Sequence, residues 1–322
     1  MKQLTLKFNP MKTFYFFAML IMFGLILLSG CEIDTDSPEI KTGTVISNGT
    51  QLTYFIEGEG YPCIVVGDGE LMSKALSSEL KNHFKFIFLN ARVNMADPGE
   101  INSITFDLLT KDVEQVRIAL NLDKVGVFGH SIAGLIALEY ARRYPQHTEF
   151  VIMNGTPPYV NDKFWGIQSS YWMNNASAER KNANSENWKG ISIDALNSLG
   201  TSDANKYSYI LDAGWSFYDF NFDASGLLSD TYWNKKVWDY ILNVLMPVYN
   251  LVQIKPVEAP VFLALGKFDF RCPYIIWNDQ KEKIPNLSVN LFEKSGHYSF
   301  YEEEELFRTK VIEWMGNTVN IK

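Results

Sequence analysis

Short apolar runs alternate with helix-like stretches along most of this chain, and this alternation is the feature that most constrains its fold. The runs typical of β-strands are GTVIS (43–47), QLTYFIEG (51–58), PCIVVG (62–67), FKFIFLN (84–90), KVGVFG (124–129), EFVIMNG (149–155), PVFLALG (260–266) and LSVNLFEK (287–294). Several are apolar without interruption, as expected of parallel strands covered on both faces. The pattern therefore predicts an α/β fold with a mostly parallel, doubly wound sheet.

Local signals agree with this arrangement. The first two runs are joined by Asn48-Gly49, a strong signal for an antiparallel hairpin. Between later runs, Leu109, Val113 and Val116 recur at helical spacing and form one apolar face. We therefore expect an antiparallel start to the sheet, followed by strands that alternate with helices.

The alternation breaks once, between Pro157 and Pro256. We expect a mostly helical cap, residues 157–258, inserted between the sixth and seventh core strands, so that the core comprises residues 43–156 and 259–322. The cap could enclose a substrate as a lid or form a second packing layer. Aromatic side chains usually form core, so its tryptophans are expected to be structural. Six of the eight tryptophans lie there: Trp165, Trp172, Trp188, Trp215, Trp233 and Trp238.

The first thirty residues have the pattern of a targeting segment rather than of a fold. Lysines precede an uncharged apolar run, residues 14–28, which is short for a membrane-spanning helix of about 20 residues. Residues 1–30 are therefore predicted to be a signal peptide. An uncleaved anchor helix is the alternative, and the true start could be Met1 or Met11.

The apolar run ends in Leu28-Ser29-Gly30-Cys31, which resembles the lipobox of bacterial lipoproteins. The resemblance implies that Cys31 becomes the lipidated first residue of the mature protein, with residues 31–42 as a polar tether. We then expect an exported protein, held on a bacterial membrane by the lipid on Cys31, at the periplasmic or cell-surface face.

Charge and cysteine usage narrow the possible functions. The 29 Lys and Arg residues are scattered and outnumbered by 37 Asp and Glu, which argues against a nucleic-acid partner. Besides Cys31, the chain holds only Cys63 and Cys272; a disulfide is possible, but their apolar neighbours favour two buried thiols. Neither cysteine has metal-site spacing. The acid run 302–305 opens a helix, where the helix dipole explains it better than a metal does.

The stretch GHSIAG, residues 129–134, nearly matches the Gly-x-Ser-x-Gly pattern of a nucleophile elbow. Ala133 stands where the last glycine is usual, and Gly134 follows it. An apolar strand precedes the stretch and a helix follows, so Ser131 is expected in a tight strand-to-helix turn. The N–H groups and partial positive charge of a helix N-terminus suit a developing oxyanion there. The alternative is that Ser131 only caps the helix.

A serine hydroxyl needs a base to become a nucleophile, and position selects His297 among the four histidines. His297 follows the last strand in a Gly-His loop that can reach the carboxyl edge of the sheet. Asp269 follows the strand 260–266 and reaches the same edge, where it could orient His297. The chain order Ser131, Asp269, His297 is the order of nucleophile, acid and base in this type of architecture. A turn aspartate and a surface histidine are the alternatives.

Together these segments resemble the α/β-hydrolase fold family over nearly all of residues 43–315. GHSIAGLIALEYARRYP resembles the elbow and its helix, and GKFDFRCP and KSGHYSFYEEEELF resemble the acid and histidine segments. NGTQLTYFIEGEGYP is most similar to the subgroup around proline iminopeptidases and related esterases. The resemblance implies a hydrolase with a Ser131–His297–Asp269 triad, a small-molecule acyl substrate, and no metal or organic cofactor.

The loop after the third strand departs from the family pattern. Relatives usually carry His-Gly-Gly-like residues there, whereas this chain has Gly67-Asp68-Gly69-Glu70. The resemblance implies that the backbone N–H groups of Gly69 and Ile132 form the oxyanion hole. The carboxylates of Asp68 and Glu70 would oppose a developing negative charge unless they point away.

The sequence therefore predicts a serine hydrolase that cleaves an ester, lactone or amide through an acyl-enzyme intermediate. One alternative is an aminopeptidase similar to proline iminopeptidases, although the Gly-Gly-Ser-Trp-Gly elbow typical of those enzymes is not present. The other is a catalytically impaired ligand-binding lipoprotein on the same scaffold. Substrate identity and oligomeric state stay open.

Overall fold

The computed structural model describes residues 41–199, 202–251 and 256–319. The predicted signal peptide, Cys31 and almost all of the predicted tether lie outside these residues. None of the helices within them is long and apolar enough to cross a membrane.

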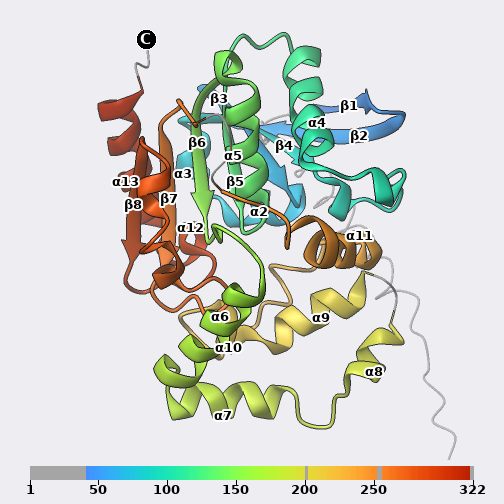
Figure 1. The fold of residues 1–322 in the computed structure, drawn as a ribbon, viewed down its shortest axis with the longest axis vertical. Coiled ribbons are helices and arrows are strands. Elements are labelled where there is room, and N and C mark those ends of the chain that lie inside the picture. Colours follow the sequence, from blue (N-terminus) through green and yellow to red (C-terminus); the bar gives the residue numbers. More distant parts are fainter. Residues whose placement is uncertain (1–40, 200–201, 252–255, 320–322) are drawn as a thin grey trace, which may run out of the picture. The chain divides into compact units, whose positions relative to one another are not determined.

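Eight strands form one sheet in the described chain (Figure 1). Their order across the sheet is β1-β2-β4-β3-β5-β6-β7-β8; β2 is antiparallel to both its neighbours, and the other pairs are parallel. Each predicted run forms a strand, which confirms the predicted α/β fold. The strands are β1 (Lys41–Ser47), β2 (Thr50–Glu57), β3 (Tyr61–Gly67), β4 (Phe84–Asn90), β5 (Val125–His130), β6 (Thr148–Asn154), β7 (Val261–Gly266) and β8 (Leu287–Phe292).

Helices cover both faces of this sheet, as a parallel sheet requires. One face is covered by α4 (Phe106–Ala119) and α5 (Ala133–Arg143). The other is covered by α2 (Gly69–Ala75), α3 (Ser78–Lys81), α12 (Ser299–Glu302) and α13 (Glu304–Thr318). Short 3-10 turns join these elements: η1 (Arg92–Asn94), η2 (Ile101–Ser103), η3 (Pro145–His147), η5 (Tyr274–Trp277) and η6 (Lys281–Lys283).

The two faces of the sheet have different apolar side chains, because side chains alternate along a strand. In β4, Ile87 and Leu89 join an aliphatic core under α4 and α5. Phe84, Phe86 and Phe88 join an aromatic core on the opposite face. This alternation fixes the register of the central strands, and with it the edge at which their carboxyl ends meet.

The insertion between β6 and β7 is helical, as predicted. It contains α6 (Asp162–Asn175), α7 (Ala178–Asn187), α8 (Ile193–Asn197), α9 (Asp203–Leu211), α10 (Ala213–Ser216), α11 (Lys235–Tyr240) and the π-helical turn η4 (Ile241–Leu245). Figure 1 shows α6 and α10 beyond the carboxyl ends of β6 and β8. Contacts with the core are direct, since Asn234 donates its N–H to the carbonyl of Val93 at 2.7 Å.

The six tryptophans of the insertion divide into two groups. Trp172 stacks on Trp215 with ring centroids 4.2 Å apart, and Trp188 donates its indole N–H to Asp212. These three are structural, as expected. Trp165, Trp233 and Trp238 line cavities at the end of the sheet, where Trp233 also packs on Tyr209, so a structural role for these three stays a prediction.

Cys63 and Cys272 are buried thiols that form no disulfide, which confirms the favoured alternative. Burial raises the pKa of both thiols above their usual range.

A buried ion pair joins the loop after β4 to α4. Arg92 is 1% exposed, and its Nε and Nη2 donate to the two carboxylate oxygens of Asp112 at 2.7 and 2.9 Å. Nη1 donates to the hydroxyl of Thr50 and to the carbonyl of Pro98. Because both charges are desolvated, loss of one partner leaves the other uncompensated.

Replacing Asp112 by Ala should therefore lower the free energy of unfolding by about 3–5 kcal/mol, measured by urea denaturation. Asp107→Ala is the matched control, because Asp107 pairs with Arg143 at the exposed surface and its loss should cost less than about 1 kcal/mol. Equal losses in the two variants would contradict this account of the buried pair.

Candidate active site

Ser131 occupies a tight turn between β5 and α5. Its φ of 56° lies in the left-handed region, which is uncommon for a residue other than glycine. A Cβ on Gly129 would lie 2.2 Å from the carbonyl oxygen of Ala133, and one on Gly134 would lie 1.9 Å from Oγ1 of Thr156. The small residues of GHSIAG are therefore required by the close approach of strand and helix.

Ser131 does not cap the helix, which was the alternative role for this residue. The N-cap position of α5 is Ile132, and no side chain caps the helix. The N–H of Ser131 donates to the carbonyl of Asn154 at 2.8 Å, which ties the turn to the end of β6. Ser131 is among the residues that line two cavities.

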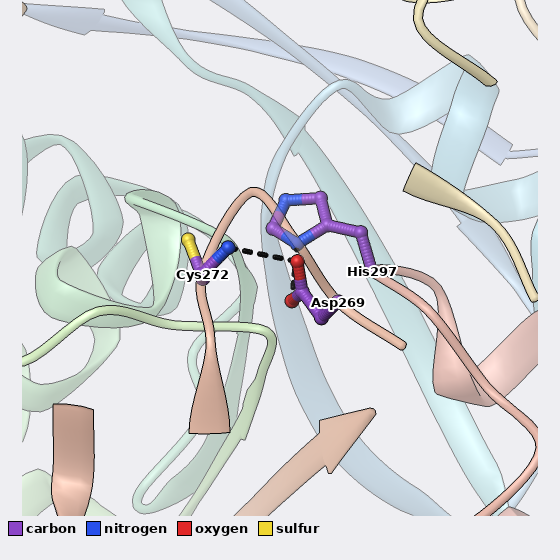
Figure 2. Close-up of side chains that lie close together, drawn as sticks. All are labelled: Asp269, Cys272 and His297. Carbon is purple, nitrogen blue, oxygen red and sulfur yellow. Dashed lines mark hydrogen bonds and ion pairs between the residues drawn. The ribbon is translucent and has the colours of Figure 1, made fainter. Parts of the chain in front are cut away.

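Asp269 and His297 form a buried pair at the same sheet edge (Figure 2). The Nδ1–H of His297 donates to Oδ2 of Asp269 at 2.8 Å. The other oxygen, Oδ1, accepts the backbone N–H groups of Arg271 and Cys272 at 2.9 and 2.8 Å. These donors hold the carboxylate facing the imidazole. The remaining ring nitrogen of His297, Nε2, is buried and has no hydrogen-bond partner within the described residues.

The backbone of His297 is held from three directions. Its carbonyl accepts Nδ2–H of Asn154 at 2.8 Å and lies 3.0 Å from Nε2 of His130, while its N–H donates to the carbonyl of Ser216 at 2.6 Å. Burial, reinforced by the neighbouring His297, lowers the pKa of His130 well below its ordinary value. His130 is therefore a neutral ring whose Nε2–H donates to that carbonyl. His130 thus positions the loop that carries His297, here called the histidine loop.

Two acids of the run 302–305 also hold the loop that carries His297. The sequence pattern had suggested only a helix-dipole role for this run. Oε2 of Glu302 accepts the N–H of Gly296 at 2.7 Å, and Oε1 accepts the N–H of Tyr218 in the insertion at 2.5 Å. Burial raises the pKa of Glu302 to about 8, against the lowering effect of these N–H donors. Glu303 binds the preceding Ser295 through its hydroxyl at 2.7 Å. The helix-dipole explanation applies to the remaining two acids, which lie in the first turn of α13.

The predicted oxyanion donor Gly69 requires correction. Its N–H donates to Oδ1 of Asn90 at 3.0 Å, and Gly69 is not among the described residues that line the cavities at Ser131. Asp68, one position earlier, does line one of them, together with Ile132. Within the described chain, neither the N–H of Asp68 nor that of Ile132 donates to a protein acceptor. These two N–H groups are therefore candidates for the oxyanion hole.

The two acids of this loop differ in environment. Asp68 is 8% exposed; its Oδ1 accepts the N–H of Leu71 at 3.1 Å, as the N-cap of α2, and its Oδ2 accepts Nδ2–H of Asn94 at 3.2 Å. Burial raises the pKa of Asp68 to about 6. Glu70 is exposed to solvent. Only Asp68 therefore brings a carboxylate to the cavity wall.

Two cavities flank Ser131. The first, here called the apolar pocket, has a volume of about 90 Å³ and is lined by Val66, Gly67, Asp68, Leu71, Met72, Ala91, Val93, Asn94, His130, Ser131, Ile132, Ala133, Ile136, Tyr209, Trp233, Trp238, Ile241 and Tyr298. The second, here called the polar pocket, has a volume of about 200 Å³ and is lined by Ser131, Ile132, Pro157, Val160, Phe164, Trp165, Gln168, Asn205, Ser208, Tyr209, Trp238, Leu242, Arg271, Cys272 and His297. Both pockets are built from core and insertion residues.

A metal ion does not fit the one cluster of possible ligands in the described residues. Asp269, Cys272 and His297 bring ligand-type atoms within 4.8 Å of one another. Both oxygens of Asp269 already accept N–H groups, and Nδ1 of His297 is the donor of one of them. Burial holds the pKa of the Cys272 thiol well above its usual range, which disfavours the thiolate that a metal needs. The cluster is better explained as an aspartate–histidine pair beside a buried thiol.

Comparison with known proteins gives consistent matches. The family model described as alpha/beta hydrolase fold matches residues 67–304. The AB hydrolase superfamily protein YclE of Bacillus subtilis (strain 168) is 28% identical over 281 residues, covering 85% of this chain and 99% of that protein. A proline iminopeptidase of Heyndrickxia coagulans is 22% identical over 217 residues, covering 62% of this chain and 69% of the enzyme. Among solved structures, an alpha/beta fold family hydrolase from Bacillus anthracis str. Sterne is similar with a TM-score of 0.64 and 22% identity, covering 85% of this chain and 99% of the other.

Proposed function

Because this chain belongs to the alpha/beta hydrolase fold family, we propose that it is a serine hydrolase that cleaves a carboxylic ester, lactone or amide through an acyl-enzyme intermediate. The observation that carries the proposal is the state of His297. Its Nδ1 is fixed by Asp269, while its Nε2 is buried and has no hydrogen-bond partner among the described residues. His297 and Ser131 both line the polar pocket. A base in that state is ready to accept a serine proton.

In the proposed mechanism, Nε2 of His297 takes the proton of the Ser131 hydroxyl as Oγ attacks the carbonyl carbon. Asp269 keeps Nδ1 protonated and stabilises the imidazolium that forms. The oxyanion of the tetrahedral intermediate accepts the N–H groups of Ile132 and Asp68. His297 then protonates the leaving group, and the bond between the acyl carbon and that group breaks. Water activated by His297 attacks the acyl-enzyme and releases the acid.

The aminopeptidase alternative has less support in the pockets. An N-terminal ammonium group needs a carboxylate partner, and no Asp or Glu is among the described residues that line the polar pocket. The apolar pocket holds one, Asp68, whose two oxygens already accept from Leu71 and Asn94. These pockets favour an acyl substrate without an ammonium group.

The ligand-binding alternative predicts an acid that fills the pocket or a cap that seals it. Asp68 is instead held at the pocket wall by its partners, and cavities remain on both sides of Ser131. We therefore keep the hydrolase proposal, with the insertion acting as a lid that excludes water from the substrate.

We also propose that the protein is exported and anchored to a bacterial membrane by lipid on Cys31. The support is the sequence LSGC at residues 28–31, preceded by a short apolar run.

Replacing Ser131 by Ala should abolish labelling by a fluorophosphonate probe and lower ester hydrolysis about a thousandfold or more, because nucleophile and base act as one unit. Ser225→Ala, which changes an exposed serine, is the control and should label like the wild type. Labelling of folded Ser131→Ala protein would reject Ser131 as the nucleophile. Absence of labelling in the folded wild type would favour the ligand-binding alternative.

Replacing Asp68 by Asn should raise kcat/KM relative to the wild type, and the ratio should grow as the pH rises from 5 to 7.5. Below pH 6 the wild-type carboxyl is protonated and neutral; above it the carboxylate is charged beside the developing oxyanion. The asparagine stays neutral at every pH and can still cap α2. We expect a gain of about threefold or more at pH 7.5.

The ratio of variant to wild type cancels the pH effects that the two proteins share. Glu70→Gln removes an exposed charge from the same turn, so its ratio should stay flat over this pH range. A flat ratio for Asp68→Asn would show that the Asp68 charge does not act on the oxyanion.

Replacing Cys31 by Ala should move the protein from the membrane fraction to the soluble fraction of cells that express it. The wild type should carry a lipid-modified Cys31, detectable by mass spectrometry of the amino-terminal peptide. If the variant stays bound to membranes, the apolar run 14–28 is an uncleaved anchor helix and the lipobox prediction is wrong.

A further inference from the structure

The polar pocket contains nitrogen atoms that lack partners. Nη2 of Arg271, Nδ2 of Asn205 and Nε2 of His297 are buried and without a hydrogen-bond partner within the described residues, and all three residues line this pocket. A buried polar atom without a partner is costly, by about 1–3 kcal/mol or more for a charged group. The proposed mechanism uses Nε2 of His297. It leaves the two donors on Arg271 and Asn205 unexplained.

Arg271 is held rigidly in position. Its Nε donates to Oγ of Ser216 at 2.6 Å, and its guanidinium lies over the ring of Tyr209, 3.6 Å from the centroid. Its backbone N–H donates to Asp269, and its carbonyl accepts Nε2–H of Gln168 at 2.6 Å. The cation is thus fixed next to the acid that orients His297, and its position is set before any ligand binds.

The residues around the cation favour an acceptor rather than a second cation. Nη2 of Arg271 forms an ion pair with Oδ2 of Asp212 at 3.5 Å, and Oδ1 of Asp212 accepts the indole N–H of Trp188. That separation is beyond ordinary hydrogen-bond length, so Nη2 keeps a free N–H. Asp212 does not line either pocket, whereas Asn205 adds an amide donor to the wall. The pocket therefore presents donors and a positive charge.

The position of His297 decides which part of a substrate enters this pocket. His297 lines the polar pocket, and its Nε2 delivers the proton to the leaving group. The leaving group therefore lies in the polar pocket. The acyl chain then lies in the apolar pocket, which is smaller and is lined mainly by aliphatic and aromatic side chains.

We propose that the substrate is an ester or amide whose alcohol or amine part carries a carboxylate, bound by Arg271 and Asn205, and whose acyl part is short and apolar. This inference rests on the proposed function. In the reaction, the bond from Oγ of Ser131 to the acyl carbon forms first, and the bond from that carbon to the leaving oxygen or nitrogen breaks when the tetrahedral intermediate collapses. The serine proton passes through His297 to the leaving atom, which departs as a hydroxycarboxylate or aminocarboxylate. Water later releases the short acid.

The test compares two ligands of nearly equal shape, butyryloxyacetate and its neutral carboxamide, butyryloxyacetamide. Their binding to folded Ser131→Ala protein, measured by calorimetry, is independent of turnover. The anionic ester should bind at least tenfold more tightly than the amide, because a charged hydrogen bond in a desolvated site is replaced by a neutral one. Equal affinities for the two ligands would overturn the proposal without any further variant.

Further variants test which residues cause the preference for the anionic ester over the neutral amide. Adding Arg271→Gln to the Ser131→Ala protein should reduce the ratio of the two affinities tenfold or more, and adding Asn205→Leu should reduce it by a smaller factor. Arg143→Gln is the matched control, because Arg143 is an exposed cation on α5 paired with Asp107, outside both pockets. If Arg143→Gln lowers the affinity ratio as much as Arg271→Gln does, the preference is a general effect of charge. That result would reject the polar pocket as the carboxylate site.

The outcome separates this inference from the proposed function. Fluorophosphonate labelling of the wild type together with equal affinities for the two ligands would keep the serine hydrolase and reject the carboxylate-bearing leaving group. Preferential binding of the anionic ester without labelling of the wild type would keep the carboxylate pocket and reject the hydrolase.

Discussion

The close approach of β5 and α5 at Ser131 is the constraint on which the rest of the site depends. It is possible only because Gly129 and Gly134 leave room for backbone and for Thr156, and it forces Ser131 into a left-handed conformation. In that conformation Ser131 lines both pockets, and α5 begins two residues later at Ala133. The N–H of Ile132 is then left for a ligand, since helix N-termini have N–H groups without partners.

The histidine loop links the core to the insertion. The N–H of His297 donates to Ser216, and the carboxylate of Glu302 joins Gly296 in the loop to Tyr218, which lies beyond α10. The base of the proposed triad is therefore positioned partly by residues of the insertion. A movement of the insertion would change the position of His297 as well as the shape of the pockets. The insertion and the base of the proposed triad are therefore mechanically coupled.

The sequence predicted the sheet and the positions of Ser131, Asp269 and His297, because strand ends follow from apolar runs and a parallel sheet brings those ends to one edge. It could not predict which N–H of the loop after β3 reaches the cavity. A single-residue offset, together with the side chain of Asn90, decides between Gly69 and Asp68. Arg271 stood in the quoted segment GKFDFRCP, but only the structure shows that its guanidinium faces the site through contacts with Tyr209 and Ser216, which are distant in the chain.

Side chains of opposite charge line the two pockets at Ser131. Asp68 lines the apolar pocket and not the polar one, whereas Arg271 lines the polar pocket and not the apolar one. Above pH 6 the Asp68 carboxylate repels an anionic group from the apolar pocket, while Arg271 attracts it to the other side. The proposed substrate, with one carboxylate, would then bind in one direction, with its leaving group toward His297. In the proposed mechanism Asp68 would weaken the oxyanion hole but help to orient the substrate, which would account for a buried carboxylate at this position.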